Sequence, residues 1–247
     1  MSQLSRRSLL KGSLAAGLMS AASLGGFNAV FGFSRVLGQA MEDDSVETII
    51  NLAATAELFA TTHYYAAIQN AAALGLDEGG INYMKAGMIA EADHYDLLAS
   101  LGAVPVVTEF YVPETLFSDA AVFAATTEVA ETTFVGAYLG ATRIFSKNGQ
   151  PNFAVTTAQI AAVEAEHRLF ARQLQRLLPN NLSYAQFLYN NVSEAVPVLQ
   201  PFLDGSGEGF IGPVTPPTAE QIAAVRADAD MIGYNTESLP YAAIAAM

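Results

Sequence analysis

The segment VEAEHRLFA, residues 163–171, places two glutamates and a histidine within an apolar stretch of the chain. An earlier segment has the same spacing, because EADH at 91–94 matches EAEH at 164–167. The chain has three histidines, and two of them stand three residues after a glutamate. On a helix, residues i and i+3 lie on one face, so each glutamate–histidine pair can point at one object.

Two other apolar segments contain isolated carboxylates. Glu57 is the one charged residue in 48–76, with histidine counted as neutral, and Glu128 and Glu131 are the two charged residues in 120–142. A lone carboxylate inside an apolar helix is costly to bury unless it has a cationic partner. These glutamates therefore need positive charge close to them.

The two halves of the chain carry these residues at matching positions. Glu57 precedes Glu91 by 34 residues. Glu131 precedes Glu164 by 33 residues. The pattern indicates a duplicated helix pair, in which the first helix supplies one glutamate and the second supplies a glutamate-x-x-histidine motif.

A tyrosine follows the isolated glutamate by seven residues in each half. Tyr64 follows Glu57 in the string AELFATTHYYA, and Tyr138 follows Glu131 in the string AETTFVGAYLG. About two helical turns return each tyrosine to the face of its glutamate. The two tyrosines are therefore candidates to hydrogen-bond ligand carboxylates or to act as redox-active neighbours, and the alternative is a pair of ordinary core tyrosines.

Four carboxylates and two imidazoles that converge in a bundle core require about four positive charges. Two divalent or trivalent metal ions supply that charge, and oxygen and imidazole ligands together suit iron or manganese. A glutamate can bridge two ions, and each histidine can bind one. The sequence thus predicts a dinuclear metal site.

The remaining polar residues of these helices have simpler interpretations. Glu128 lies about one turn before the other glutamate of its helix, which makes it a candidate auxiliary or entry ligand. His63 falls off the ligand face and is expected to serve packing or the surface. Glu166, Asp93 and Asp96 are expected to face water.

The periodicity predicts an all-α chain. Helices are expected at about 44–74, 80–101, 119–146, 156–178 and 183–203, with a short one near 218–228. The segment VPVVTEFYVP, 104–113, is expected to be an extended connection that crosses the bundle. The predicted fold is a four-helix bundle with a long crossover, an additional C-terminal helix and a loop-rich tail, in which 41–180 form the bundle and 181–247 the extension.

The first 40 residues have the features of an export signal. SRRSLLK at 5–11 contains paired arginines, an uncharged run follows over 12–34, and small residues precede Ala40. This pattern predicts a twin-arginine (Tat) signal that is cleaved to leave a protein starting near Met41, in the periplasm or outside the cell. The alternative is a retained membrane anchor.

Composition excludes several classes of function. Residues 1–40 hold four of the 11 basic residues and none of the 24 acidic ones, so the rest of the chain carries seven basic residues against 24 acidic. Such an acidic surface argues against nucleic acid and anionic membranes as partners and is compatible with cations. The chain has no cysteine, which excludes cysteine-ligated zinc, haem and iron–sulfur sites.

The sequence resembles the ferritin-like superfamily of di-iron carboxylate bundles, and most closely its exported branch of ferritin-like domain or desiccation-related proteins. The resemblance covers about residues 45–178. It rests on Glu57, EADH at 91–94, AETTFVGAYLGA at 130–141 and IAAVEAEHR at 160–168. It implies a ferritin-like fold and two iron ions, or manganese as the alternative. The ligands that it implies are Glu57, Glu91, His94, Glu131, Glu164 and His167.

The resemblance also implies a class of chemistry. The bound metals would oxidise iron or react with oxygen or peroxide, which makes the protein a candidate ferroxidase or peroxide-consuming enzyme. The alternative is a structural or stress-protective exported protein in which any metal only stabilises the bundle. The region after residue 178 differs from that of cage-forming ferritins, which argues against a hollow ferritin-type cage and leaves a homodimer open.

Overall fold

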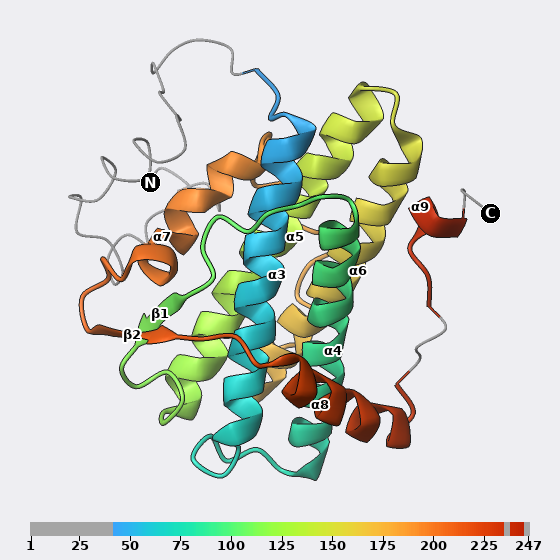
Figure 1. The fold of residues 1–247 in the computed structure, drawn as a ribbon. Helices are drawn as coiled ribbons and strands as arrows, with labels where there is room; N and C mark the ends of the chain where they lie inside the picture. The colour runs from blue at the N-terminus through green and yellow to red at the C-terminus, as the bar shows by residue number, and fades with distance from the viewer. Residues whose placement is uncertain (1–41, 235–237, 245–247) are drawn as a thin grey trace.

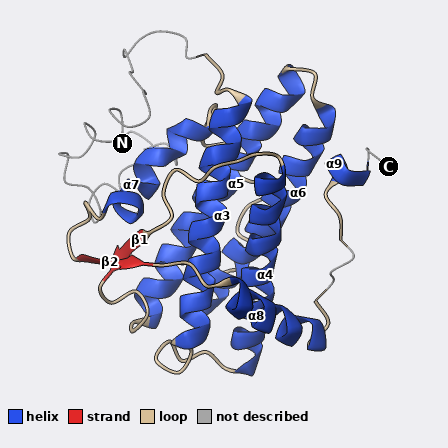
Figure 2. Ribbon diagram, in the orientation of Figure 1, coloured by secondary structure: helices blue, strands red, loops and turns tan. Residues whose placement is uncertain are grey.

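The chain folds as two long helix pairs joined by a crossover (Figure 1). The computed structural model describes residues 42–234 and 238–244, so the predicted signal at 1–40 lies outside the described residues. The elements are α3 (Val46–Gln69), α4 (Glu78–Ser100), β1 (Phe110–Pro113), α5 (Ala120–Lys147), α6 (Pro151–Leu174), η1 (Val192–Ala195), α7 (Val196–Asp204), β2 (Phe210–Val214), α8 (Ala219–Met231) and α9 (Tyr241–Ile244). Figure 2 shows that helices dominate, so the predicted all-α bundle is confirmed.

Polar caps set where the bundle helices begin. Ser45 caps α3 by accepting a hydrogen bond from the Thr48 amide at 3.1 Å, so this helix starts slightly later than predicted. Asp44 instead accepts hydrogen bonds from the amide and the hydroxyl of Ser193, both at 2.8 Å. The start of the bundle is thereby attached to η1 in the C-terminal extension.

The fourth bundle helix begins and ends earlier than predicted. Pro151 stands in the first turn of α6, where its missing N–H leaves no hydrogen bond unmade. The helix ends at Leu174, and Arg176 then adopts a positive φ of 58°. A non-glycine residue in this conformation marks the turn that terminates the helix.

The predicted helix over 183–203 is wrong in its first part. Only η1 and the short α7 are helical there, and Pro197 lies in the first turn of α7. The segment before η1 lies directly against α5: a Cβ on Gly136 would come within 3.1 Å of the Tyr189 ring, and one on Gly140 within 3.1 Å of the Tyr189 carbonyl oxygen. The glycines of α5 thus admit an irregular segment at close range, and this tertiary contact replaces the predicted helix.

The crossover and the tail form a small antiparallel sheet. β1 pairs with β2, and Phe110 is opposite Val214. Phe110 is fully buried, and its ring packs edge-on against Phe59 of α3 with the centroids 5.4 Å apart. The predicted extended crossover is therefore present, and it also anchors the C-terminal tail to the bundle (Figure 1).

The helix α8 packs against α4. A capping box at Thr218 starts α8. Its Asp228 accepts from Lys85 at 2.6 Å, and its Arg226 donates to Asp93 at 2.5 Å. Asp93 was expected to face water only, and the structure corrects this because the tail returns to pair with it.

The helices bury several threonines without leaving their hydroxyls unpaired. Thr61 donates to the carbonyl of Glu57, and Thr127 donates to the carbonyl of Phe123, each at 2.8 Å. Such bonds to the residue four positions earlier satisfy a hydroxyl inside the helix itself.

Among the residues that the structure describes, no helix is long and apolar enough to cross a membrane.

Candidate metal centre

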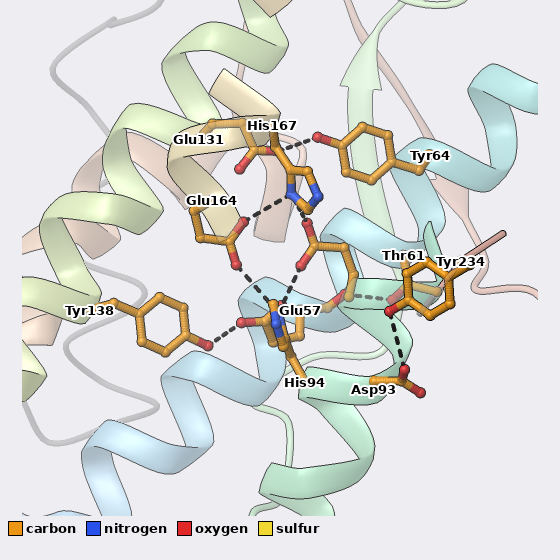
Figure 3. Close-up of polar contacts among 11 residues, drawn as sticks. Glu57, Thr61, Tyr64, Asp93, His94, Glu131, Tyr138, Glu164, His167 and Tyr234 are labelled. Carbon is orange, nitrogen blue, oxygen red and sulfur yellow. Dashed lines mark hydrogen bonds and ion pairs between the residues drawn. The ribbon is translucent and has the colours of Figure 1, made fainter. Parts of the chain in front are cut away.

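Six predicted ligands meet in the centre of the bundle (Figure 3). Each of the four long helices supplies at least one of them. Glu57 comes from α3, Glu91 and His94 from α4, Glu131 from α5, and Glu164 and His167 from α6. The four glutamates are at most 2% exposed. The i, i+3 spacing on α4 and α6 and the antiparallel pairing of the helices bring these side chains to one level of the bundle.

The cluster consists of two overlapping groups of donors, each compact enough to hold one ion. Within each group, one ligand atom per residue lies within 4.8 Å of the others. The first group is Glu57, Glu91, His94 and Glu164, and the second is Glu91, Glu131, Glu164 and His167. Two glutamates therefore belong to both groups, as bridging ligands would.

The distances show how the shared glutamates span the two groups. Glu91 places Oε2 3.3 Å from Nδ1 of His94 and Oε1 2.8 Å from Nδ1 of His167. Glu164 places Oε1 3.4 Å from Nδ1 of His94 and Oε2 3.2 Å from Nδ1 of His167. Each shared carboxylate thus directs one oxygen to each histidine.

The two predicted tyrosines reach across the bundle to the unshared glutamates. Tyr64 of α3 donates a hydrogen bond to Glu131 of α5, and Tyr138 of α5 donates to Glu57 of α3. The tyrosine of each half therefore holds the carboxylate of the other half (Figure 3). Each bond fixes one carboxylate oxygen and leaves the second oxygen free to face the cluster.

Several carboxylate oxygens of the cluster lack hydrogen bonds. Oε1 of Glu91, Oε2 of Glu131 and Oε1 of Glu164 are buried without a donor among the described residues. The oxygen of Glu91 is close to His167 but is not aligned for a hydrogen bond. Buried acceptors in a folded protein are normally satisfied, so these oxygens are available as ligands for a cation.

The ionisation of the cluster reflects its burial and its unbalanced charge. Burial, and then repulsion from neighbouring carboxylates, raises the pKa of both Glu57 and Glu131 well above the usual range. Burial also raises the pKa of Glu91, but the His167 cation outweighs this and leaves that pKa below its usual value. Burial lowers the pKa of His94 and His167, and the adjacent carboxylates outweigh it and raise both pKa values. Without metal, the cluster therefore retains protons in place of cations.

Aromatic side chains cover the His167 side of the cluster. The Tyr83 ring stacks on Phe170 with centroids 3.8 Å apart, and its edge faces His167 at 6.3 Å. The Tyr83 hydroxyl donates to the carbonyl of Glu166 at 2.8 Å. Tyr83 was not predicted from the sequence, although Phe170 stands three residues after His167 and so shares its helix face.

The C-terminal extension flanks the other side of the cluster. Asp93, the residue before His94, accepts a hydrogen bond from Arg226. It accepts another from Tyr234 at 3.3 Å (Figure 3). The His94 side chain is 13% exposed, against 5% for His167. The His94 side is therefore the more accessible of the two.

Glu128 is not at the cluster, which corrects its prediction as an auxiliary ligand. Its carboxylate accepts hydrogen bonds from Arg172 and, at 2.8 Å, from Gln175, and it lies 3.5 Å from Arg168. These partners belong to α6 and the turn that follows it. They neutralise Glu128 at a level of the bundle away from the other glutamates.

His63 has the packing role that was predicted for it. It is buried, its ring stacks on Phe123 with centroids 4.9 Å apart, and its Nε2 lies 2.8 Å from the Thr127 hydroxyl. Burial lowers the pKa of His63 to about 4. Glu166 and Asp96 are exposed, as expected.

A family model described as a ferritin-like domain matches residues 45–177, more than half of the chain. The chain belongs to the ferritin-like domain family. This confirms the resemblance to the ferritin-like superfamily, while the assignment to an exported branch stays a prediction. The matched range contains all six cluster residues of this ferritin-like chain. A comparison with curated proteins and with solved structures gives no match.

Proposed function

We propose that this ferritin-like chain holds two metal ions in the central cluster and uses them to oxidise iron or to react with oxygen or peroxide. The observation that supports this most strongly is the pair of donor groups that share Glu91 and Glu164. Iron is the proposed metal, with manganese as the alternative, because carboxylate oxygens and imidazole nitrogens suit both.

The residues present fit such a pair of ions. Four buried glutamates and two neutral histidines would carry four negative charges, and two divalent ions would balance them. The unpaired oxygens of Glu91, Glu131 and Glu164 supply ligand positions that no donor of the described chain occupies. Six protein ligands also leave coordination positions open for a small molecule.

Each residue has a defined part in holding the ions. Glu91 and Glu164 would bridge them, Glu57 and His94 would complete one site, and Glu131 and His167 would complete the other. When bound, two ions that each exchange one electron match the two-electron reduction of dioxygen to peroxide or of peroxide to water.

The protein around the cluster orients the ligands and excludes water. The hydroxyls of Tyr64 and Tyr138 fix the unshared carboxylates across the bundle. Burial, together with the carboxylate that each one contacts, raises the pKa of both phenols, so they stay protonated and donate. They are also the tyrosines that are hydrogen-bonded to the cluster carboxylates, which makes them the candidate redox-active neighbours.

A structural role is the second candidate function. The two donor groups together take residues from α3, α4, α5 and α6, so ions held in them would connect four helices and could serve only to stabilise the bundle. This role fits a stress-protective protein. It differs from the first candidate in predicting metal binding without turnover.

The two candidates are separated by loading and assay. Metal-free protein would be loaded separately with ferrous iron and with manganous ion, its metal content measured, and oxygen uptake and peroxide loss followed. Turnover with one metal that is lost in His167→Gln and kept in His63→Gln supports the enzyme. The second variant is a matched control, because it changes a buried histidine outside the cluster. Binding of two ions without turnover in either assay contradicts the enzyme and supports the structural role.

Export by the Tat route, with cleavage near Met41, is a further part of the proposal. It is supported by SRRSLLK at 5–11, ahead of the uncharged run, and places the protein in the periplasm or outside the cell. Changing Arg6 and Arg7 together to lysine should leave the precursor in the cytoplasm. Normal export of that double variant would contradict the Tat assignment.

A further inference from the structure

A pocket of about 40 Å³ lies between α3, α5 and the η1–α7 segment. Leu52 of α3, Ala137 of α5 and Leu199 of α7 are among its lining residues. The C-terminal extension thus completes a wall of this pocket. The pocket lies partly outside the matched ferritin-like range, which ends at residue 177.

The lining of the pocket offers no partner to water. Thr55 and Tyr138 are the two lining residues with polar side chains. The Thr55 hydroxyl already donates to Asn51 O at 2.7 Å and accepts from Val106 N at 2.8 Å, and the Tyr138 hydroxyl is bound to Glu57. A water in a buried cavity needs two to four polar partners, whereas apolar cavities stay dry and take apolar molecules.

Tyr138 connects the pocket with the central cluster. The Tyr138 ring lines the pocket, and its hydroxyl contacts the Glu57 carboxylate. Ala56, the residue before Glu57, lines the pocket as well. A molecule in the pocket would therefore lie beside a tyrosine that contacts the cluster.

The duplicated halves show why space is left here. Ala137 stands six residues after Glu131, and the equivalent residue six after Glu57 is His63. The His63 ring fills its half of the bundle by stacking on Phe123. Ala137 fills no such volume, and it lines the pocket.

The size of the pocket limits its occupant. A cavity needs roughly 10–15 Å³ to hold one water-sized probe, and an apolar cavity of about 150 Å³ takes benzene. At about 40 Å³, this pocket suits a molecule of a few heavy atoms and is too small for a lipid or an aromatic cofactor.

We propose that the pocket binds a small apolar molecule and that its ligand is dioxygen held next to the metal cluster. The dioxygen assignment rests on the proposed function, whereas binding of a small apolar molecule does not. Xenon is a suitable probe because it is apolar and small, and apolar cavities bind it.

The test fills the pocket and compares the result with a matched surface change. Ala137→Leu places a larger side chain in the pocket, and Ala125→Leu makes the same change at an exposed position of the same helix. In full-length protein under xenon pressure, crystallography should show xenon beside Tyr138 in the wild type and in Ala125→Leu. It should be lost in Ala137→Leu.

The absence of xenon from the wild-type pocket would overturn the proposal. If Ala137→Leu fails to fold, Leu52→Ala replaces it, because enlarging the pocket should raise xenon occupancy, and unchanged occupancy would contradict the site. With iron bound at equal content, oxygen-dependent oxidation should be several-fold slower in Ala137→Leu than in Ala125→Leu. Equal rates would overturn the dioxygen assignment. Failure of the wild type to consume oxygen would count against the proposed function. The xenon experiment would still show whether the pocket binds a small apolar molecule.

Discussion

The two halves of the candidate metal centre have the same donors but different surroundings. Each half has one unshared glutamate, one histidine and a tyrosine from the opposite helix pair. On the His167 side, the stacked Tyr83 and Phe170 close the site, whereas on the His94 side the C-terminal extension approaches through Tyr234. Duplication of the helix pair therefore explains the ligand set, and the segments added around it explain the differences in access.

The largest expected effect comes from removing a shared glutamate. Glu91→Gln should lose both ions, because Glu91 belongs to both donor groups. Glu57→Gln should lose only the ion on the His94 side and retain the other. Elemental analysis of purified protein gives the metal content of each variant. Equal losses in the two variants would contradict the assignment of shared and unshared ligands.

Metal removal should destabilise the bundle. It should also reverse the effect of Glu57→Gln on stability. An ion bound only by the folded state adds about 4 kcal/mol when its free concentration is a thousand times Kd. Without metal, the pKa of Glu57 is raised, so its carboxyl favours the protonated form in the folded protein. Glu57 therefore reduces the free energy of unfolding as the pH rises above the pKa that this residue has in the unfolded chain. Glu57→Gln should therefore lower the melting temperature of the metal-bound form and raise or preserve that of the metal-free form. A similar loss in both forms would indicate a packing role.

The duplication explains how much of the centre the sequence could predict. The ligands depend on intervals of three and seven residues within single helices, and helix geometry fixes where those side chains point. Glu128 could not be placed in this way, because its partners Arg168 and Arg172 come from another helix. The Tyr83 cover was missed for the same reason, since its role depends on stacking between α4 and α6.

The fold was predictable over the duplicated part and less so beyond it. α3 to α6 follow from apolar periodicity and capping residues. The segment 183–191 looked helical from its sequence, but it is irregular, and its residues 188–190 lie against the glycines of α5. Helix α7 begins only at Val196. Strand β2 is likewise set by a distant partner, β1. Contacts between segments far apart in the chain determine the conformation of these regions, and the local sequence pattern does not reveal such contacts.

His63 offers a pH test of the difference between the halves, because Ala137 occupies the equivalent position. The pKa of His63 falls from 6.5 to about 4 on folding, so between these pH values the unfolded state binds a proton that the folded state does not. The stability contributed by neutral His63 is present above pH 6.5 and is lost as the pH falls toward 4, at about 1.4 kcal/mol per pH unit. His63→Phe, which keeps a ring against Phe123, should lose less stability over this range by chemical denaturation. Parallel pH profiles would contradict the assignment.

The smallest expected effect concerns access to the His94 side. Arg226→Ala removes a partly exposed ion pair with Asp93 and should cost about 0–1 kcal/mol of stability. It should nevertheless speed metal release to a chelator, because α8 is held less firmly beside His94. Lys147→Ala, which removes an exposed ion pair with Asp43 elsewhere, is the control. Equal release rates in the two variants would mean that α8 does not limit access.

We propose that two ions occupy the cluster and share Glu91 and Glu164. Anomalous diffraction from crystals of the metal-loaded protein, collected at the absorption edge of the metal, tests it directly. The expected result is two peaks about 3.5–4 Å apart. One peak should lie within bonding distance of Nδ1 of His94 and the other within bonding distance of Nδ1 of His167, with both shared carboxylates between them. A single peak, or no peak among these residues in protein that retains metal in solution, would contradict the dinuclear centre.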